Sequence, residues 1–368
     1  MRMMIREKEI WREAGRNLAC GASRTIVAVL LLAATLGALG WAQAASVVDL
    51  ARQAKTYRES GAAIRLVVLH ELIDGAQCDK LNGYPGIAAA GATRTGSSLS
   101  LAAMPARKLE TVEATPGLAK VLGLDAKAAN AGVWLSSDLA GVLGISQAGV
   151  DLPLADGTVS QTSAIYQWAD NDGRPPTLAY TIVQPVPAQG KFDTCWVELW
   201  PEGDTADAVL TLPALAGPPD PNTGQRQLPQ VEQLNTTLGW RFDALGKLAK
   251  LPTDSLTLAG VLIGLVLGAG LIRSRRLELA AALHAGVPKT ALVGQIMVEI
   301  FTIGLCAACL AVPTAIYAAK AGNPDPPWPA LFPALRTVAL AVLAAVLGAL
   351  LITLATREKH LFRHFKNR

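Results

Sequence analysis

RSRRLELAAALHAGVPKTALVGQIMVEI, residues 273–300, lies between two long apolar runs. After its cluster of arginines, the leucine- and alanine-rich part has the composition of a helix. This helix is expected to end at Gly286, because glycine is a common terminator of helices. Pro288 suits the first turn of a second helix, which becomes apolar and continues as a membrane span. The stretch therefore predicts a compact helix–turn–helix between two spans.

The rest of the chain is strongly apolar. Of its 368 residues, 51% are hydrophobic and 17% are charged, against about 25% charged residues in soluble domains. A bilayer core needs about 20 apolar residues. Four ranges meet this length, and they are 25–45, 253–272, 291–319 and 337–356. We therefore predict an α-helical membrane protein with four transmembrane helices.

Basic residues flanking the spans predict their orientation, because lysine and arginine in short loops are retained in the cytoplasm. Such residues gather in segment 1–24, in segment 273–290 and in the tail 357–368. The loop 320–336 holds Lys320 and Asp325 among prolines, so it is expected outside. Both termini are then cytoplasmic.

The first span has an alternative interpretation as a cleaved leader, since Ala42-Gln43-Ala44 resembles a signal-peptidase site. However, the apolar run is longer than the about 7–15 residues of a secretory leader, and a charged segment precedes it. We expect an uncleaved span. Segment 1–24 is predicted to be an amphipathic helix at the inner membrane face or a simple retention signal.

Residues 46–252 form one large extracytoplasmic insert, which carries 21 acidic and 16 basic residues. Partial alternation predicts strands in AIRLVVLHEL, SQTSAIYQW, PTLAYTIVQPV and KFDTCWVELW. Short helices are predicted in TPGLAKVLGL and DLAGVLGI, beginning at Thr115 and Asp138. Helical spacing after the first span and before the second predicts a paired stalk, with 231–248 as its second helix. The insert is thus an α+β domain on a stalk.

The cysteines and one intramembrane acid are the other candidate sites. Cys78 and Cys195 both lie in the insert, where oxidation is permitted, so they are disulfide candidates. Cys306 and Cys309 lie within the third span and are expected to serve packing. Glu299 is a costly acidic group in the same span. We expect it to be hydrated near the interface or to bind a basic residue of the preceding loop.

Several classes of chemistry have no motif in this sequence. There is no G-x-x-x-x-G-K-[ST] phosphate loop and no H-E-x-x-H or zinc-type pair of cysteines and histidines. There is also no G-x-S-x-G elbow. The net charge of +4 marks membrane topology, so no nucleic-acid partner is expected. We predict a non-catalytic chain that binds no metal and no cofactor.

The stretch 273–300 resembles the cytoplasmic loop of FtsX/MacB-type (type VII) ABC transporter permeases. The matching residues are Arg273, Arg275, Arg276, Glu278, Leu279, Leu283, Ala285, Gly286 and Glu299. That family also has the same architecture, in which one span is followed by a large insert and then by three further spans. Residues 132–168 are similar to the MacB-like periplasmic core, although Thr162, Ser163 and Ala164 replace its last strand pattern.

This resemblance implies a permease subunit in the inner membrane of a bacterium. A separate cytoplasmic ABC ATPase would bind ATP and magnesium, and a second FtsX-like permease, the same chain or a different one, would pair with this one in the lipid. The implied ATPase-coupling residues are Arg273, Arg275, Arg276, Glu278, Leu279, Leu283, His284, Gly286, Pro288 and Lys289. For Glu299 the resemblance favours a structural or coupling role.

Two functions are consistent with this resemblance. In the first, called mechanotransmission, an ATP-driven conformational change is passed on to the insert. It serves the export or extraction of a peptide, antibiotic, lipid or lipoprotein. In the second, the chain is a sensor or an FtsX-like regulator of an extracellular cell-wall hydrolase, and no substrate crosses the membrane. An extracellular or periplasmic protein is then a further partner.

Overall fold

A computed structural model describes residues 7–19, 25–125, 132–168, 173–201, 204–219 and 225–356. The chain divides into two compact units. The membrane unit comprises Met1–Gln53 and Ala244–Arg368, and the insert unit comprises Ala54–Asp243. Cys20 and the basic tail 357–368 lie outside the described residues.

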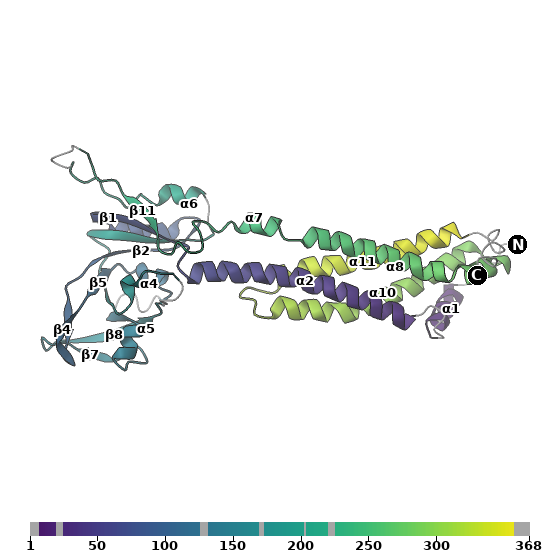
Figure 1. Cartoon of the computed structure of the whole chain (residues 1–368), viewed down its shortest axis with the longest axis horizontal. Helices are drawn as coiled ribbons and strands as arrows, with labels where there is room; N and C mark the ends of the chain where they lie inside the picture. Colours follow the sequence, from purple (N-terminus) through teal and green to yellow (C-terminus); the bar gives the residue numbers. More distant parts are fainter. Residues whose placement is uncertain are drawn as a thin grey trace. The chain divides into compact units, whose positions relative to one another are not determined.

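The membrane unit is helical (Figure 1). Its helices are α1 (Glu7–Ala19), α2 (Thr25–Glu59, which enters the insert unit), α7 (Ala244–Ala249), α8 (Thr253–Ser274), α9 (Arg276–His284), α10 (Lys289–Lys320) and α11 (Trp328–Ala355). By length and composition, the helices containing the four predicted spans are able to cross a membrane. The described part of the chain therefore has the predicted number of spanning helices.

Helices α8 and α11 are in close backbone contact, and glycines make this contact possible. Gly260, Gly264 and Gly268 recur every fourth residue on one face of α8 and are buried. A Cβ atom at Gly264 or Gly268 would overlap the carbonyl oxygen of Ala341 or Ala345 on α11. Small residues at this spacing allow membrane helices to approach closely.

The loop between α10 and α11 is shorter than the predicted segment 320–336, because α11 begins at Trp328. Arg336 therefore lies inside a helix, where its Nη2 donates to Oδ1 of Asp254 at 2.6 Å. At the end of α10, Arg52 of α2 donates to the carbonyl oxygens of Ala321 and Gly322. These bonds connect α2, α8, α10 and α11 at one end of the unit.

The insert unit is built on a mixed nine-stranded sheet (Figure 1). In spatial order its strands are β11 (Gln230–Gln233), β1 (Ile64–Asp74), β10 (Lys191–Leu199), β2 (Ile87–Thr95), β5 (Thr111–Ala114), β9 (Ile182–Pro185), β6 (Val133–Ser136), β8 (Val159–Tyr166) and β7 (Asp151–Pro153). A separate hairpin consists of β3 (Leu99–Leu101) and β4 (Met104–Leu109). The unit is therefore α+β, as the alternation predicted, and its largest buried side chain is Trp134.

The short helices of the insert unit are α3 (Gly75–Lys80), α4 (Leu118–Val121), α5 (Ser137–Val142) and α6 (Asp204–Val209). The two predicted starting residues are wrong. The N-cap of α5 is Ser136, whose hydroxyl accepts from the Leu139 N–H at 3.2 Å. The hydroxyl of Thr115 instead accepts from the Ala92 N–H at 2.8 Å, so α4 begins later.

The second stalk helix is also a wrong prediction. Gln230–Gln233 forms strand β11, which pairs with β1, and only α7 is helical between it and α8. The amide of Gln233 is buried and donates to the carbonyl oxygens of Ala62 and Gly239. Pairing with β11 satisfies backbone groups along the edge of β1 that would otherwise be unpaired. Of the apolar positions in this segment, Leu234 and Phe242 are buried, whereas Leu238, Leu245 and Leu248 are exposed.

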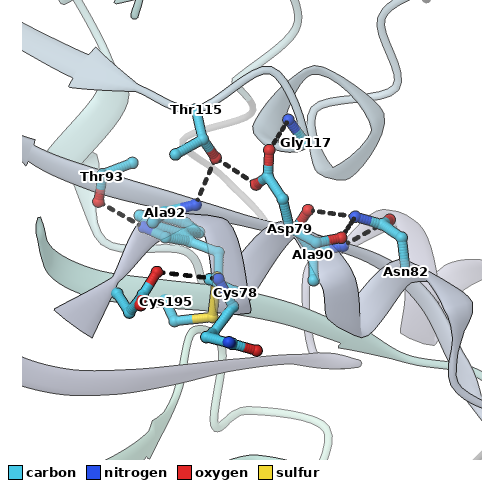
Figure 2. Close-up of a disulfide and its surroundings, with 12 residues drawn as sticks. Cys78, Asp79, Asn82, Ala90, Ala92, Thr93, Thr115, Gly117 and Cys195 are labelled. Atoms are coloured by element: carbon cyan, nitrogen blue, oxygen red, sulfur yellow. Dashed lines mark hydrogen bonds between the residues drawn. A yellow bond between two sulfur atoms is a disulfide. The ribbon is translucent and has the colours of Figure 1, made fainter. Parts of the chain in front are cut away.

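A disulfide joins α3 to the centre of the sheet. Cys78 and Cys195 are bonded, with a Cα–Cα distance of 5.9 Å, and both are fully buried. Figure 2 shows Asp79 beside it, where Oδ1 accepts from the Thr115 hydroxyl at 2.5 Å and Oδ2 accepts from the Gly117 N–H at 3.2 Å. Burial raises the pKa of Asp79 above its ordinary value, although these hydrogen bonds lower it in part. The disulfide and Asp79 hold α3 and α4 on the sheet.

Candidate functional site

The candidate site is the turn that joins α8, α9 and α10. Helix α8 ends at Ser274, and Arg275 separates it from α9. After α9, Gly286 adopts a φ of +88°, a conformation that side chains other than glycine rarely tolerate. Pro288 is the N-cap of α10. The predicted helix–turn–helix is therefore present, with both turn residues in their predicted places.

The centre of this turn is a buried ion pair between the loop and the third span. Nη1 of Arg275 lies 2.5 Å from Oε2 of Glu299, and the Glu299 side chain has no exposed surface. Arg275 also contacts both carboxylate oxygens of Glu278 at 2.9 and 2.7 Å. This matches the expectation that Glu299 binds a basic residue of the loop.

Arg275 is held in its charged form. The hydrogen bonds to Glu278 raise the pKa of Arg275 above its ordinary value, and Glu299 adds to this effect, although partial burial opposes it. Only 10% of the Arg275 side chain is exposed. Arg275 is therefore a structural element that links the turn to α10, and its predicted role in ATPase coupling stays a prediction.

The N-terminal helix reaches the same acid. Nδ2 of Asn17 on α1 donates to Oε1 of Glu299 at 2.7 Å, and Nε2 of Gln295 donates to the same oxygen at 3.2 Å. Ala14 on α1 is fully buried, while Trp11 is 65% exposed. Glu299 therefore connects α1, the start of α9 and α10 through one carboxylate.

Helix α9 has a buried and an exposed face. Leu279 and Ala280 are buried, and Leu279 belongs to a cluster that includes Ile272 and Ile296 of the flanking helices. Leu283 is half-buried at the edge of the same cluster. The exposed positions around the turn are Arg273, Ser274, Glu278, Ala281, His284, Ala285, Gly286, Lys289 and Thr290. One face of α9 therefore packs within the membrane unit, and the other is exposed.

The predicted site residues thus divide into two groups. The turn is stabilised from inside by Arg275, Leu279, Leu283 and Glu299. The residues that face outward are Arg273 and His284. Arg276 and Lys289 belong to neither group. Arg276 is half-buried, and Nζ of Lys289 donates to the Leu354 carbonyl oxygen at 2.6 Å, so it connects α10 to the last turn of α11.

Sequence reasoning missed three contributors to this site. Asn17 and Gln295 carry no motif, and their contacts with Glu299 depend on tertiary structure. The glycine repeat of α8 did have a signal, because its G-x-x-x-G spacing is typical of closely packed membrane helices. Among the described residues, no three histidine, cysteine, aspartate or glutamate side chains are placed to share a metal ion.

The fold and the turn define a class of protein, namely a helical membrane subunit with a large α+β insert between its first two spans. Residues 255–360 match the family model described as FtsX-like permease C-terminal. This match supports an FtsX/MacB-type ABC permease and confirms the resemblance over the matched residues. The matched range contains the turn and the last three spanning helices. No curated protein matches the chain in a sequence comparison.

Proposed function

We propose that this chain is the permease subunit of an ABC transporter and that it contains no catalytic centre of its own. A separate ATPase binds ATP and magnesium and docks on the turn between α8 and α10, at the cytoplasmic face of a bacterial inner membrane. A second FtsX-like permease, either another copy or a different chain, completes the complex. In this arrangement both termini are cytoplasmic.

The observation that carries this proposal is the two-faced helix α9. Its buried face packs with the spanning helices through Leu279, and Arg275 fixes its first turn to Glu299 on α10. A push on the exposed face therefore moves α8 and α10 together, because packed interiors transmit strain. Force applied by an ATPase would reach the spans without first bending a flexible loop.

We further propose that the insert unit is a MacB-like periplasmic core that responds to this movement. Helix α2 runs without interruption from Thr25 to Glu59, which supports a mechanical path out of the membrane. The response would export or extract a peptide, an antibiotic, a lipid or a lipoprotein. ATPase turnover that rises with one of these substrates supports export. Turnover that rises only with a bound cell-wall hydrolase supports the alternative function, in which the chain regulates that hydrolase.

The docking face is tested by placing acidic residues on it while the buried ion pair stays intact. The double variant Arg273→Glu/His284→Glu is expected to weaken co-purification of the ATPase from native membranes about tenfold, a change worth about 1.4 kcal/mol. The ATPase rate stimulated by the permease should fall in parallel.

Lys320→Glu is the matched control, because Lys320 is exposed at the opposite end of α10. It should leave co-purification and the stimulated rate unchanged. An equal loss in both variants would indicate a general effect of charge, and no loss in the double variant would exclude this face as the docking site.

A further inference from the structure

The membrane unit has an ion pair at the end opposite the turn between α8 and α10, and none of the preceding functions uses it. Asp254 is the second residue of α8, and Nη2 of Arg336 on α11 donates to its Oδ1 at 2.6 Å. The Asp254 side chain is 91% exposed and that of Arg336 is 40% exposed. Charged side chains in spanning helices are rare, because hydrocarbon does not solvate them, and they mark functional sites. This pair therefore needs polar groups from its surroundings.

Aromatic side chains place this pair at the level of lipid headgroups. The exposed rings of Trp41 on α2 and Tyr317 on α10 stack with centroids 5.8 Å apart. Tryptophan and tyrosine are enriched where membrane helices meet the headgroups. Gln43 follows Trp41 by two residues, about 3 Å along the helix axis. Its Nε2 donates to Oγ1 of Thr257 at 3.1 Å, and Nη2 of Arg336 donates to the same oxygen at 3.3 Å. The aromatic rings and the guanidinium group therefore lie at a similar depth.

Both members of the pair have hydrogen-bonding groups left over. Over the described parts of the chain, Arg336 donates only through Nη2, so its Nε and Nη1 groups have no partner, and neither has Oδ2 of Asp254. The two charges cancel, so the pair does not select a ligand of one sign. It matches a headgroup that carries both signs, because a phosphate accepts from a guanidinium and a primary ammonium has three N–H donors for a carboxylate.

Exposed leucines continue from both charged residues toward the middle of the spanning helices. Leu258 lies four residues after Asp254, and Leu340 lies four residues after Arg336, so each follows its charged residue on the same helix face. Their side chains are 59% and 41% exposed. The order of the glycine contacts between α8 and α11 shows that the two helices run in the same direction. A lipid with its headgroup at the ion pair can therefore lay its acyl chains over both leucines.

We propose that Asp254 and Arg336 bind the headgroup of a phospholipid that carries a primary ammonium, such as phosphatidylethanolamine. The phosphate would accept from Nε and Nη1 of Arg336, and the ammonium would donate to Oδ2 of Asp254. The acyl chains would cover Leu258 and Leu340. Because the headgroup contacts both α8 and α11, a bound lipid would hold these helices together at this end. The site does not depend on ATPase coupling, because its residues lie outside the turn.

The test titrates the purified full chain in detergent with three phospholipids of identical acyl chains, namely phosphatidylethanolamine, phosphatidylcholine and phosphatidylglycerol. Native mass spectrometry measures the affinity of the first bound lipid. We expect phosphatidylethanolamine to bind about tenfold more tightly than either of the others, a difference of about 1.4 kcal/mol. Phosphatidylcholine has a quaternary ammonium without N–H donors, and phosphatidylglycerol has no cation. Equal affinity for the three lipids, or tighter binding of either of the others, would overturn the proposal.

The substitution Asp254→Asn assigns this preference to the ion pair. It removes the partner of the ammonium and leaves the charge of Arg336 unbalanced, so the variant should bind phosphatidylglycerol at least as tightly as phosphatidylethanolamine. Asp325→Asn is the matched control, because Asp325 is an exposed aspartate in the loop between α10 and α11. This control should keep the preference of the unchanged chain.

The substitution Arg336→Gln tests the phosphate contact. It should weaken all three lipids, since each has a phosphate, whereas Lys320→Gln at the exposed end of α10 should weaken none. Melting temperatures show whether each variant is folded. If Arg336→Gln melts early, the Asp254→Asn comparison decides, because the Asp254 side chain is exposed and supports no core. A preference for phosphatidylethanolamine that survives Asp254→Asn would overturn the proposal, as would a folded Arg336→Gln variant that binds all three lipids like the unchanged chain.

Discussion

Replacement of Arg275 by methionine is expected to lower the free energy of unfolding of the membrane unit by about 3–5 kcal/mol, because it leaves Glu299 as an unpaired buried charge. Glu299 has no exposed surface, and Arg275 is its cationic partner at 2.5 Å. The amides of Asn17 and Gln295 would still contact the carboxylate but cannot neutralise it. The loss should therefore be far larger than the loss of a surface ion pair, which is about 0–1 kcal/mol.

Two further variants show whether the buried charge causes this loss. Arg273→Met removes an equivalent but exposed arginine two residues away, and it should have little effect on unfolding. The double variant Arg275→Met/Glu299→Leu removes both charges and should recover most of the stability. Unfolding is followed by circular dichroism during titration with a denaturing detergent. Equal midpoints for Arg275→Met and Arg273→Met would contradict a buried ion pair.

Replacement of Gly268 by alanine is expected to separate α8 from α11 and to cost about 1–3 kcal/mol, as overpacking does in other cores. The added Cβ would overlap the Ala345 carbonyl oxygen and lie against its backbone, which cannot rotate away as a side chain could. The same change at Gly264 meets the backbone of Ala341. The double variant should be less stable than either single variant.

Gly270→Ala is the matched control, because a Cβ atom there has no neighbour within 4 Å. It lies on the same helix, so it should stabilise the protein by up to about 1 kcal/mol through helix propensity alone. Melting temperatures in nanodiscs compare the variants. If the Gly268→Ala variant had the same melting temperature as the Gly270→Ala variant, the close approach of α8 and α11 would be contradicted.

The membrane unit was the more predictable part of the chain, for a physical reason. A bilayer requires long apolar helices with satisfied backbones, so hydropathy alone located them, and the predicted span 253–272 nearly coincides with α8. The start of α11 was missed because the predicted loop extended to Arg336. In the structure its charge is paired with Asp254, and a sequence does not show such a pair.

The candidate site was predictable in position but not in detail. Glycine and proline marked the turn because their backbone preferences are local. Which arginine faces outward depends on how α9 packs, so the sequence did not show that Arg275 is the one that binds Glu299. The strand β11 was missed for a similar reason, since its pairing with β1 joins segments far apart in the sequence.

The most direct measurement of ATPase docking is photo-crosslinking in native membranes from a benzoylphenylalanine residue at position 284. His284 is exposed at the end of α9, so the substituted side chain would face a docked partner. The account predicts one main protein adduct, with a chain that carries a G-x-x-x-x-G-K-[ST] phosphate loop. Crosslinks to lipid alone, or to a protein outside the cytoplasm, would contradict it.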